Sequence, residues 1–266
     1  MEIYHYICYF FIYAFIGWCV EVCYAAFDDG VFVNRGFLNG PVCPIYGVGV
    51  CVVVFVLTPL KDNILLLFAG SILLTSALEW LTGFVLEKVF HQKWWDYSNK
   101  PFNLQGYICP LFSVLWGLAC LLVMDIVHPG VERLVKWLPL KIGIPLVALF
   151  GLLLIVDLVL TVMTMAKLNE KLRQIDELSA AMKVVSDRIG KNLSDGVLGI
   201  TEKSEPVKEF AGKKRAELEF RLADAKEKIS FGQQRILKAF PDFKSLRHEG
   251  ALNMIKVYLE ERKKKK

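Results

Sequence analysis

The chain has 266 residues, of which 55% are hydrophobic and 22% charged, and its formal net charge is +5 at pH 7. Most of the 32 Lys and Arg residues lie after residue 166, so the first part of the chain is slightly acidic and the remainder strongly basic. Apolar runs close to the roughly 20 residues that cross a bilayer recur in the first part, which excludes an ordinary soluble domain. We predict an all-α polytopic membrane protein with a transmembrane domain, 1–166, and a basic helical C-terminal domain, 167–266.

Five spans are predicted. In chain order, they cover about Ile3–Phe27, Val42–Leu57, Ile64–Leu86, Gly106–Val127 and Ile142–Ala166. The segment His128–Lys141 is too short and too charged to cross, so we expect it at the membrane interface, anchored by Trp137 and by Lys136 and Lys141. The first run lacks a basic start and a cleavage site, and we expect it to stay in the membrane rather than act as a signal peptide.

The region after Ala166 has the period of a coiled coil, because apolar residues recur at spacings of four and three. The seam comprises Leu168, Leu172, Ile175, Ser179, Met182, Ser186, Ile189 and Leu193. Gly and Pro break the pattern at Ser194–Pro206, and further helices are predicted over about Val207–Ala239 and Leu246–Arg262. This tail is predicted to pack on itself or to form a homodimer. Binding to anionic lipid is the alternative, and nucleic acid is not an expected partner, because acidic residues are interspersed.

The topology follows from the tail. A long Lys-rich segment is expected on the cytoplasmic side, which with five spans puts the N-terminus outside. The polar loops Asp28–Asn39 and Lys88–Gln105 then lie inside, whereas the charges of the short loops balance and add no orientation of their own.

An internal repeat relates the first four spans. The segment LNGPVCPIYGV (Leu38–Val48) matches LQGYICPLFSV (Leu104–Val114) without a gap, and the same offset places Gly17 and Glu21 on Gly83 and Glu87. We therefore predict two helix–loop–helix units, repeat 1 over about 5–60 and repeat 2 over about 71–126. Each has an even number of spans, so the units are parallel repeats about an axis near the membrane normal.

Three acidic residues are the main candidates for a site within the spans: Glu21, Glu79 and Glu87. Ionisable groups in a span mark a functional site or a buried pair. In a structural interpretation Glu21 and Glu87 pair locally with Arg35, Lys88 or backbone amides. In a functional one they line, with Glu79, a polar cavity on the repeat axis that holds a cation, a proton or a polar headgroup.

The loops between the spans supply the remaining candidates. Gly40, Pro41 and Pro44 in the first copy, with Gly106 and Pro110 in the second, cannot continue a helix. They mark either a helix start with Pro in the first turn or a broken entrance whose free N–H groups face a polar ligand. The candidates for a polar cap over the axis are Asn34, Arg35, Asp96 and Asn103.

Two longer segments carry a family resemblance. NRGFLNGPVCPIYGVG (Asn34–Gly49) and LEKVFHQKWWDYSNKPFNLQGYIC (Leu86–Cys109) resemble the bacterial family of ABC-transporter type IV membrane proteins. The resemblance covers roughly residues 5–125 and implies a multi-span, permease-like protein of the bacterial plasma membrane. The chain has no GxxxxGK[ST] phosphate loop, so in such a transporter the ATPase is a separate subunit.

Three functions remain open from the sequence. The first is a permease that moves an ion or small polar solute through a site on the repeat axis. The second is a non-transporting scaffold or sensor that acts through its coiled-coil tail, and the third is a lipid-modifying membrane enzyme. No catalytic residue, metal site or cofactor is predicted, because nucleophile motifs and zinc spacings are absent from the sequence and the seven Cys form no CxxC pair.

Overall fold

The computed structural model of the chain describes residues 2–197 and 205–264. Its helices and helical turns are α1 (Glu2–Asp29), α2 (Pro44–Leu57), η1 (Thr58–Leu60), α3 (Ile64–Phe90), α4 (Pro110–Leu122), η2 (Val123–Val127), α5 (His128–Trp137), α6 (Leu140–Val197), α7 (Glu205–Glu227), α8 (Phe231–Ala239) and α9 (Glu249–Lys264). Two-residue strands, β1 (Gln92–Lys93) and β2 (Lys244–Ser245), complete the regular structure of the described residues. The prediction of an all-α fold is confirmed.

The described chain divides into two compact units. The first contains the residues up to Met163 together with a short returning segment, Arg235–Phe243. The second contains Thr164–Gln234 and the residues from Lys244 onward. The returning segment comes from the predicted C-terminal domain, and the sequence pattern gave no indication that it would pack with the membrane helices.

Four helical runs of the described residues are long and apolar enough to cross a bilayer: Glu2–Asp28, Ile64–Phe90, Pro110–Trp137 and Leu140–Asp187. The run formed by α2 and η1, Pro44–Leu60, is apolar but shorter. The chain is therefore a helical membrane protein. Of the five predicted spans, four have a helix of spanning length and the second has the shorter one.

The fourth span continues past its predicted end at Val127, because α4, the π-helical turn η2 and α5 follow one another without a break as far as Trp137. Pro129 lies in the first turn of α5 and has no backbone N–H group to donate. Its ring would also clash with the carbonyl of the residue four positions earlier in a regular α-helix. A wider π turn directly before it accommodates the ring and lets the helix continue. The predicted interfacial segment is thus mostly helical.

Helices α2 and α4 begin in the same way. Pro44 and Pro110 occupy the first turn, and each follows a Cys in an extended conformation, Cys43 or Cys109, with no side-chain cap. Proline suits this position because the first N–H groups of a helix have no partner inside it. The simpler of the two sequence interpretations, a helix start with Pro in the first turn, describes both loops.

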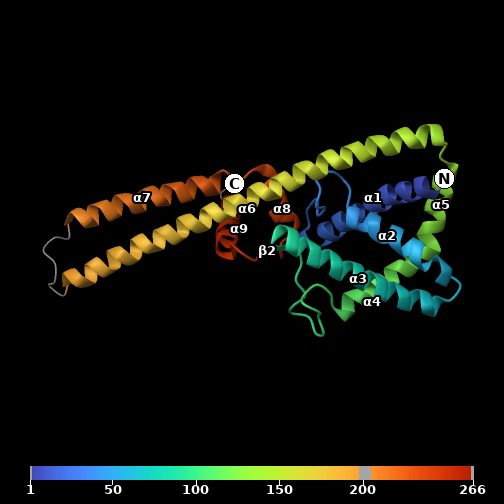
Figure 1. The fold of residues 1–266 in the computed structure, drawn as a ribbon, viewed down its shortest axis with the longest axis horizontal. Helices are drawn as coiled ribbons and strands as arrows, with labels where there is room; N and C mark the ends of the chain where they lie inside the picture. Colours follow the sequence, from blue (N-terminus) through green and yellow to red (C-terminus); the bar gives the residue numbers. More distant parts are fainter. Residues whose placement is uncertain (1, 198–204, 265–266) are drawn as a thin grey trace. The chain divides into compact units, whose positions relative to one another are not determined.

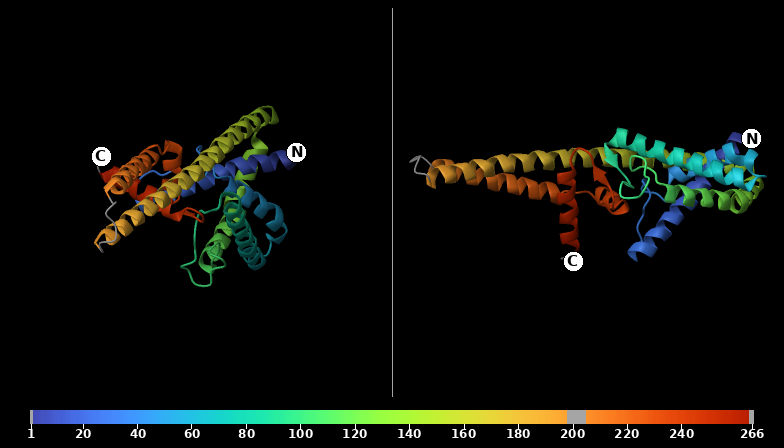
Figure 2. Two further views of the ribbon diagram at one scale, coloured as in Figure 1. Left: turned by 60° about the vertical axis from the view of Figure 1, so that its left-hand side comes forward. Right: turned by 90° about the horizontal axis from the view of Figure 1, so that it is seen from below.

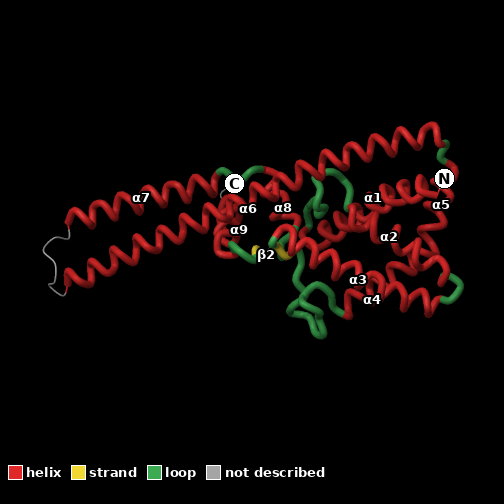
Figure 3. Tube along the Cα trace, viewed as in Figure 1, coloured by secondary structure: helices red, strands yellow, loops and turns green. Residues whose placement is uncertain are grey.

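The membrane helices pack in neighbouring pairs, α1 against α2 and α3 against α4 (Figures 1 and 2). One core joins α2, α3 and the fourth span through Val53, Val54, Leu57, Leu67, Cys120 and Met124. A second joins α1 to α5 through Cys8, Tyr9, Tyr13, Val131 and Val135. Long loops connect α1 to α2 and α3 to α4 (Figure 3).

In the second unit, α7 runs back beside the C-terminal part of α6 (Figure 1). The first three seam residues, Leu168, Leu172 and Ile175, are fully buried within the chain. The single helix predicted over Val207–Ala239 is two, α7 and α8. Ser230 Oγ accepts from the backbone N–H of Gln233, whose side chain accepts from the N–H of Ser230, so a capping box starts a new helix. Most of the predicted break, Ser194–Pro206, and the side chains of Ile189 and Leu193 lie outside the described residues.

Candidate functional site

The first acidic candidate, Glu21, is held by two partners from its own predicted repeat. The Tyr46 hydroxyl donates a hydrogen bond of 2.5 Å to Glu21 Oε1, and Arg35 Nε lies 3.2 Å from Oε2. Close packing allows the first contact, since the Tyr46 ring lies directly on Gly17, one helical turn before the acid. Of the partners expected for Arg35, the structure places Glu21 beside it.

Glu87, the counterpart of Glu21 in the second predicted repeat, also contacts one phenol and one cation, but at sequence positions that do not match those of Tyr46 and Arg35. The Tyr107 hydroxyl donates a hydrogen bond of 2.7 Å to Glu87 Oε2, and Lys93 Nζ lies 4.0 Å from the same oxygen. Burial raises the pKa of Tyr107 to about 12, and the hydrogen bond to Glu87 contributes to the rise. The phenol therefore remains a donor at neutral pH.

Glu79 lies deeper in α3 and has no cationic partner among the described residues. The Tyr97 hydroxyl donates a hydrogen bond of 3.3 Å to Glu79 Oε1, and the Trp116 side chain lies near the same carboxyl group. The second oxygen, Oε2, is buried and has no hydrogen-bond partner among the described residues. An unpaired carboxylate oxygen inside a membrane protein is costly unless a proton or a cation accompanies it.

The environments of Glu21 and Glu79 meet through aromatic side chains. The ring centroids of Tyr46 and Trp116 are 5.9 Å apart, which joins the Glu21 side to the Glu79 side. Burial raises the pKa of the Tyr97 phenol, and the carboxylates of Glu79 and, more weakly, Glu21 raise it further. We call these five residues, Glu21, Tyr46, Glu79, Tyr97 and Trp116, the polar cluster. It contains residues from both predicted repeats, whereas Glu87 is held by its own loop.

The first loop, which follows α1, is braced by Asn34 and by a carboxylate of α6. Asn34 accepts from the indole N–H of Trp18 at 2.8 Å and donates to the Asn39 carbonyl at 2.9 Å. Asp157 accepts from the backbone N–H groups of Asn39 and Gly40 at 3.1 and 2.7 Å. Asn34 and Gly40 thus shape this loop, and exposed Pro41 lies between Gly40 and the start of α2.

The remaining loop candidates brace the second loop from within. Asp96 accepts from the backbone N–H of Ser98 at 3.0 Å, and Asn103 accepts from the N–H of Gly106 at 3.0 Å. Gly106 has a φ of 75°, and a Cβ atom there would lie 2.6 Å from Asp96 Oδ1, so no other residue fits without strain. In their described contacts, Asp96 and Asn103 therefore stabilise the conformation of the second loop.

Sequence reasoning missed Asp157, Tyr46, Tyr97 and Trp116. Asp157 had a usable signal, because it is the one ionisable residue in the predicted fifth span. The aromatic residues had none, since tyrosine and tryptophan are common at membrane interfaces whatever their role. The described residues contain no group of three or more His, Cys, Asp and Glu side chains that could hold a metal ion.

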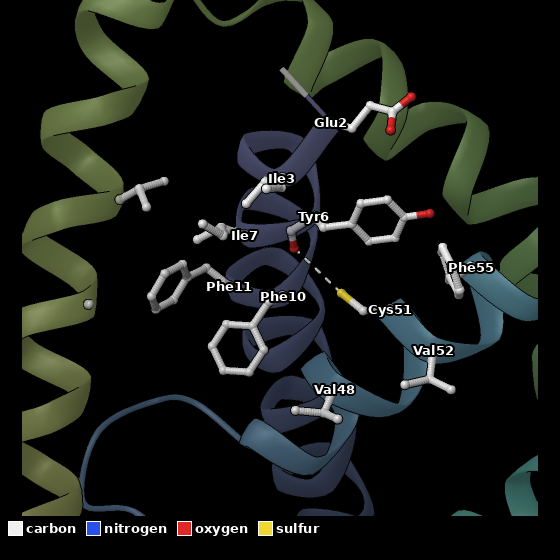
Figure 4. Close-up of a pocket in the computed structure, with 12 residues that line it drawn as sticks. Glu2, Ile3, Tyr6, Ile7, Phe10, Phe11, Val48, Cys51, Val52 and Phe55 are labelled. Atoms are coloured by element: carbon white, nitrogen blue, oxygen red, sulfur yellow. Dashed lines mark hydrogen bonds between the residues drawn. The ribbon is translucent and has the colours of Figure 1, made fainter.

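A hollow of about 770 Å³ lies away from the polar cluster, between α1, α2 and the first part of α6 (Figure 4). Its walls are mainly apolar and include Ile3, Phe10, Phe11, Val48 and Phe55, with Glu2 as the one charged residue. None of the predicted site residues lines it. The hollow suits hydrocarbon rather than a polar solute.

Comparison with known proteins identifies a family. The model of the family described as "Putative ABC-transporter type IV" matches residues 8–162, which is more than half of the chain. Searches of curated proteins and of solved structures give no match. The matched residues contain all of the predicted site residues and the whole polar cluster.

Proposed function

Because the chain belongs to the ABC-transporter type IV family, we propose that it is a permease-like membrane protein that moves an ion or small polar solute past the polar cluster. The proposal includes the predicted division into a membrane domain, 1–166, and a basic helical domain, 167–266. It also includes a bacterial plasma membrane location with a cytoplasmic tail. Any ATPase would be a separate chain, because the sequence contains no phosphate loop of its own.

The observation that carries this proposal is the buried, unpaired oxygen of Glu79. Glu21 has a cation beside it in Arg35, so its charge is compensated within the protein. Among the described residues, Glu79 has only a phenol and a nearby indole as partners, so we expect its charge to be compensated by a bound proton or cation. The two carboxyl groups thus differ in a way that suits one fixed ion pair and one exchangeable site.

The test is ion flux in liposomes that contain the purified full chain. A pH-sensitive dye inside the liposomes measures the proton flux. The flux of other ions is measured separately for each of a panel of alkali cations. Glu79→Gln keeps the shape of the side chain but removes its charge, and we expect it to slow the flux at least about tenfold, because it removes the exchangeable site. Glu21→Gln is expected to slow it as well, by releasing Arg35 next to the site.

A matched control is Glu132→Gln. Glu132 lies near the end of the fourth span, where it pairs with Lys136 at 2.7 Å, away from the polar cluster. This variant should transport like the unchanged protein. Equal flux of every tested ion through Glu79→Gln, Glu21→Gln and the unchanged chain, with all three folded, would rule out the site.

A scaffold or sensor is the second candidate, and the second unit favours it. Its helices bury Leu168, Leu172 and Ile175 and are linked by contacts such as that between His248 Nδ1 and Asp176 Oδ2 at 3.0 Å. Such a packed helical unit can recognise a protein partner. Proteins that co-purify with the full chain in mild detergent distinguish the candidates, since an ATPase favours the permease and a signalling protein the scaffold.

A further inference from the structure

The returning segment, Arg235–Phe243, contacts both long loops of the membrane helices. The chain leaves the first compact unit after Met163 and enters it again at Arg235, within α8. Everything between these points belongs to the second unit. The chain therefore passes between the two units at the ends of the returning segment as well as along α6.

Arg235 makes the contact with the first loop. Its Nη1 and Nη2 atoms donate hydrogen bonds of 2.9 and 2.8 Å to the backbone carbonyls of Gly36 and Phe37. Nε is buried and has no hydrogen-bond partner among the described residues. Burial lowers the pKa of the guanidinium, and the Asp157 carboxylate partly offsets this effect. Two carbonyls in a row match the rigid fork of an Arg, which Lys cannot reproduce.

Aromatic residues make the contact with the second loop. Trp94, which follows β1, is buried, and its ring centroid lies 4.8 Å from that of Phe240 and 5.3 Å from that of Phe243. Phe37 of the first loop packs on the same indole at 5.2 Å. The returning segment therefore lies against an aromatic cluster to which both loops contribute.

The first loop in turn leads to the polar cluster. Arg35, which pairs with Glu21, directly precedes the Gly36 carbonyl that Arg235 holds. Asp157 holds the next amides of the loop, at Asn39 and Gly40. The carboxylate of Asp157 thus binds N–H groups of the first loop, and the guanidinium of Arg235 binds its carbonyls. Asp157 belongs to the helix that leads into the second unit, and Arg235 to the segment that returns from it.

We propose that residues 235–243 form a releasable strap that locks the first loop and, through it, the pairing of Arg35 with Glu21. Both connections of the second unit, α6 and the strap, hold the same loop, so a change in that unit reaches Glu21 through the loop backbone. When the strap leaves, the Gly36 and Phe37 carbonyls lose their donors, so the loop loses its anchor beside Arg35 while Asp157 and the contacts of Asn34 still hold it. The strap and its effect on the loop stand apart from the proposed transport activity.

Hydrogen exchange of the full chain in detergent tests the strap without any flux measurement. Arg235→Gln should speed amide exchange in peptides that cover residues 34–43 at least about tenfold, because hydrogen bonds to a charged donor are lost. Exchange in α3 should stay unchanged. The control is Lys238→Gln, an exposed position in the same helix, which should leave every peptide as it was.

A second variant tests whether the segment acts as one piece. Phe240→Ala removes the ring contact with Trp94 in the second loop and leaves the hydrogen bonds of Arg235 to the first loop in place. A strap predicts faster exchange in residues 34–43 for this variant too. Faster exchange confined to residues 92–97 would mean two independent contacts and would overturn the proposal. An unchanged first loop in Arg235→Gln, or exchange that rises equally in all helices, would overturn it as well.

Discussion

At the scale of single residues, Gly17 decides whether Glu21 can be held. A Cβ atom at Gly17 would lie 2.4 Å from Cγ of Tyr46, the residue whose hydroxyl binds Glu21. Gly17→Ala must therefore push the ring away, and we expect a loss of about 1–3 kcal/mol in the free energy of unfolding, as in other overpacked cores. Thermal unfolding in detergent measures the loss as a lower midpoint.

The matched control for this prediction is Gly49→Ala in α2, where no heavy atom lies within 4 Å of the added carbon. This variant should keep or slightly raise the midpoint, because alanine favours a helix over glycine. An equal fall in both variants would show that the effect belongs to helix glycines in general and not to the contact with Tyr46.

The partners of the acidic residues were only partly predictable. Arg35 was expected beside Glu21 or Glu87 on charge alone, but the phenols were not expected. Repeat reasoning could not find them, because Tyr46 matches Phe112 and the partner of Glu87, Tyr107, matches Pro41. The two acids that the offset matches accept hydrogen bonds from tyrosines that it does not match, so the offset could not identify these tyrosines. Tertiary packing chooses these partners.

At the scale of elements, the start and end of each helix show what local pattern can and cannot predict. Apolar length located α1, α2 and α3 closely, since their bounds follow from composition. The fourth span was predicted to end at Val127 because the residues after it are charged, whereas the π turn before Pro129 carries the helix on to Trp137. Whether a Pro ends or only distorts a helix depends on the packing that follows, here that of α5 against α1.

Helix α6 anchors the first loop through the carboxylate of Asp157, and Thr161 of the same helix accepts one further hydrogen bond of 3.1 Å from Asn39 Nδ2. Asp157→Asn replaces a charged acceptor of two backbone N–H groups with a neutral one. We expect a loss of about 1.5–3 kcal/mol in the free energy of unfolding, the range for hydrogen bonds to charged groups. Amide exchange at Asn39 and Gly40 should also become faster, and mass spectrometry of the matching peptides measures it.

A suitable control is Asp125→Asn. Asp125 lies in η2 and is exposed, so the same chemical change should leave both the unfolding midpoint and the loop exchange unaltered. If Asp157→Asn behaved like this control, its contacts with the loop would contribute nothing to stability, and the first loop would not depend on this carboxylate.

At the scale of the whole molecule, the C-terminal region is divided between the two units, and composition alone does not predict this division. The charge step near residue 166 indicated a soluble tail but could not show that Arg235–Phe243 packs with the membrane helices. That packing depends on one Arg and two Phe among many similar residues. Long-range contacts of this kind have no local signal, because only the folded chain brings the carbonyls of Gly36 and Phe37 to Arg235.

The seam at the start of the second unit gives a prediction about the assembly state. Leu168, Leu172 and Ile175 have the spacing of a dimeric coiled coil, but their side chains are already buried within one chain. Leu172→Asp therefore buries a charge without a matched partner, and we expect a large fall in the unfolding midpoint of the full chain. The exposed residue Val184, on the same helix, supplies the control Val184→Asp, which should have little effect.

Protein concentration separates this intrachain packing from a dimer. A seam buried within one chain gives an unfolding midpoint that does not change with concentration, both for the unchanged protein and for Leu172→Asp. A seam shared between two copies gives a midpoint that rises with concentration, and Leu172→Asp would then halve the particle mass in detergent. Light scattering coupled to size exclusion, with the detergent contribution subtracted, measures that mass. A concentration-dependent midpoint that Leu172→Asp abolishes would show that residues 168–175 leave their own chain to join a second copy.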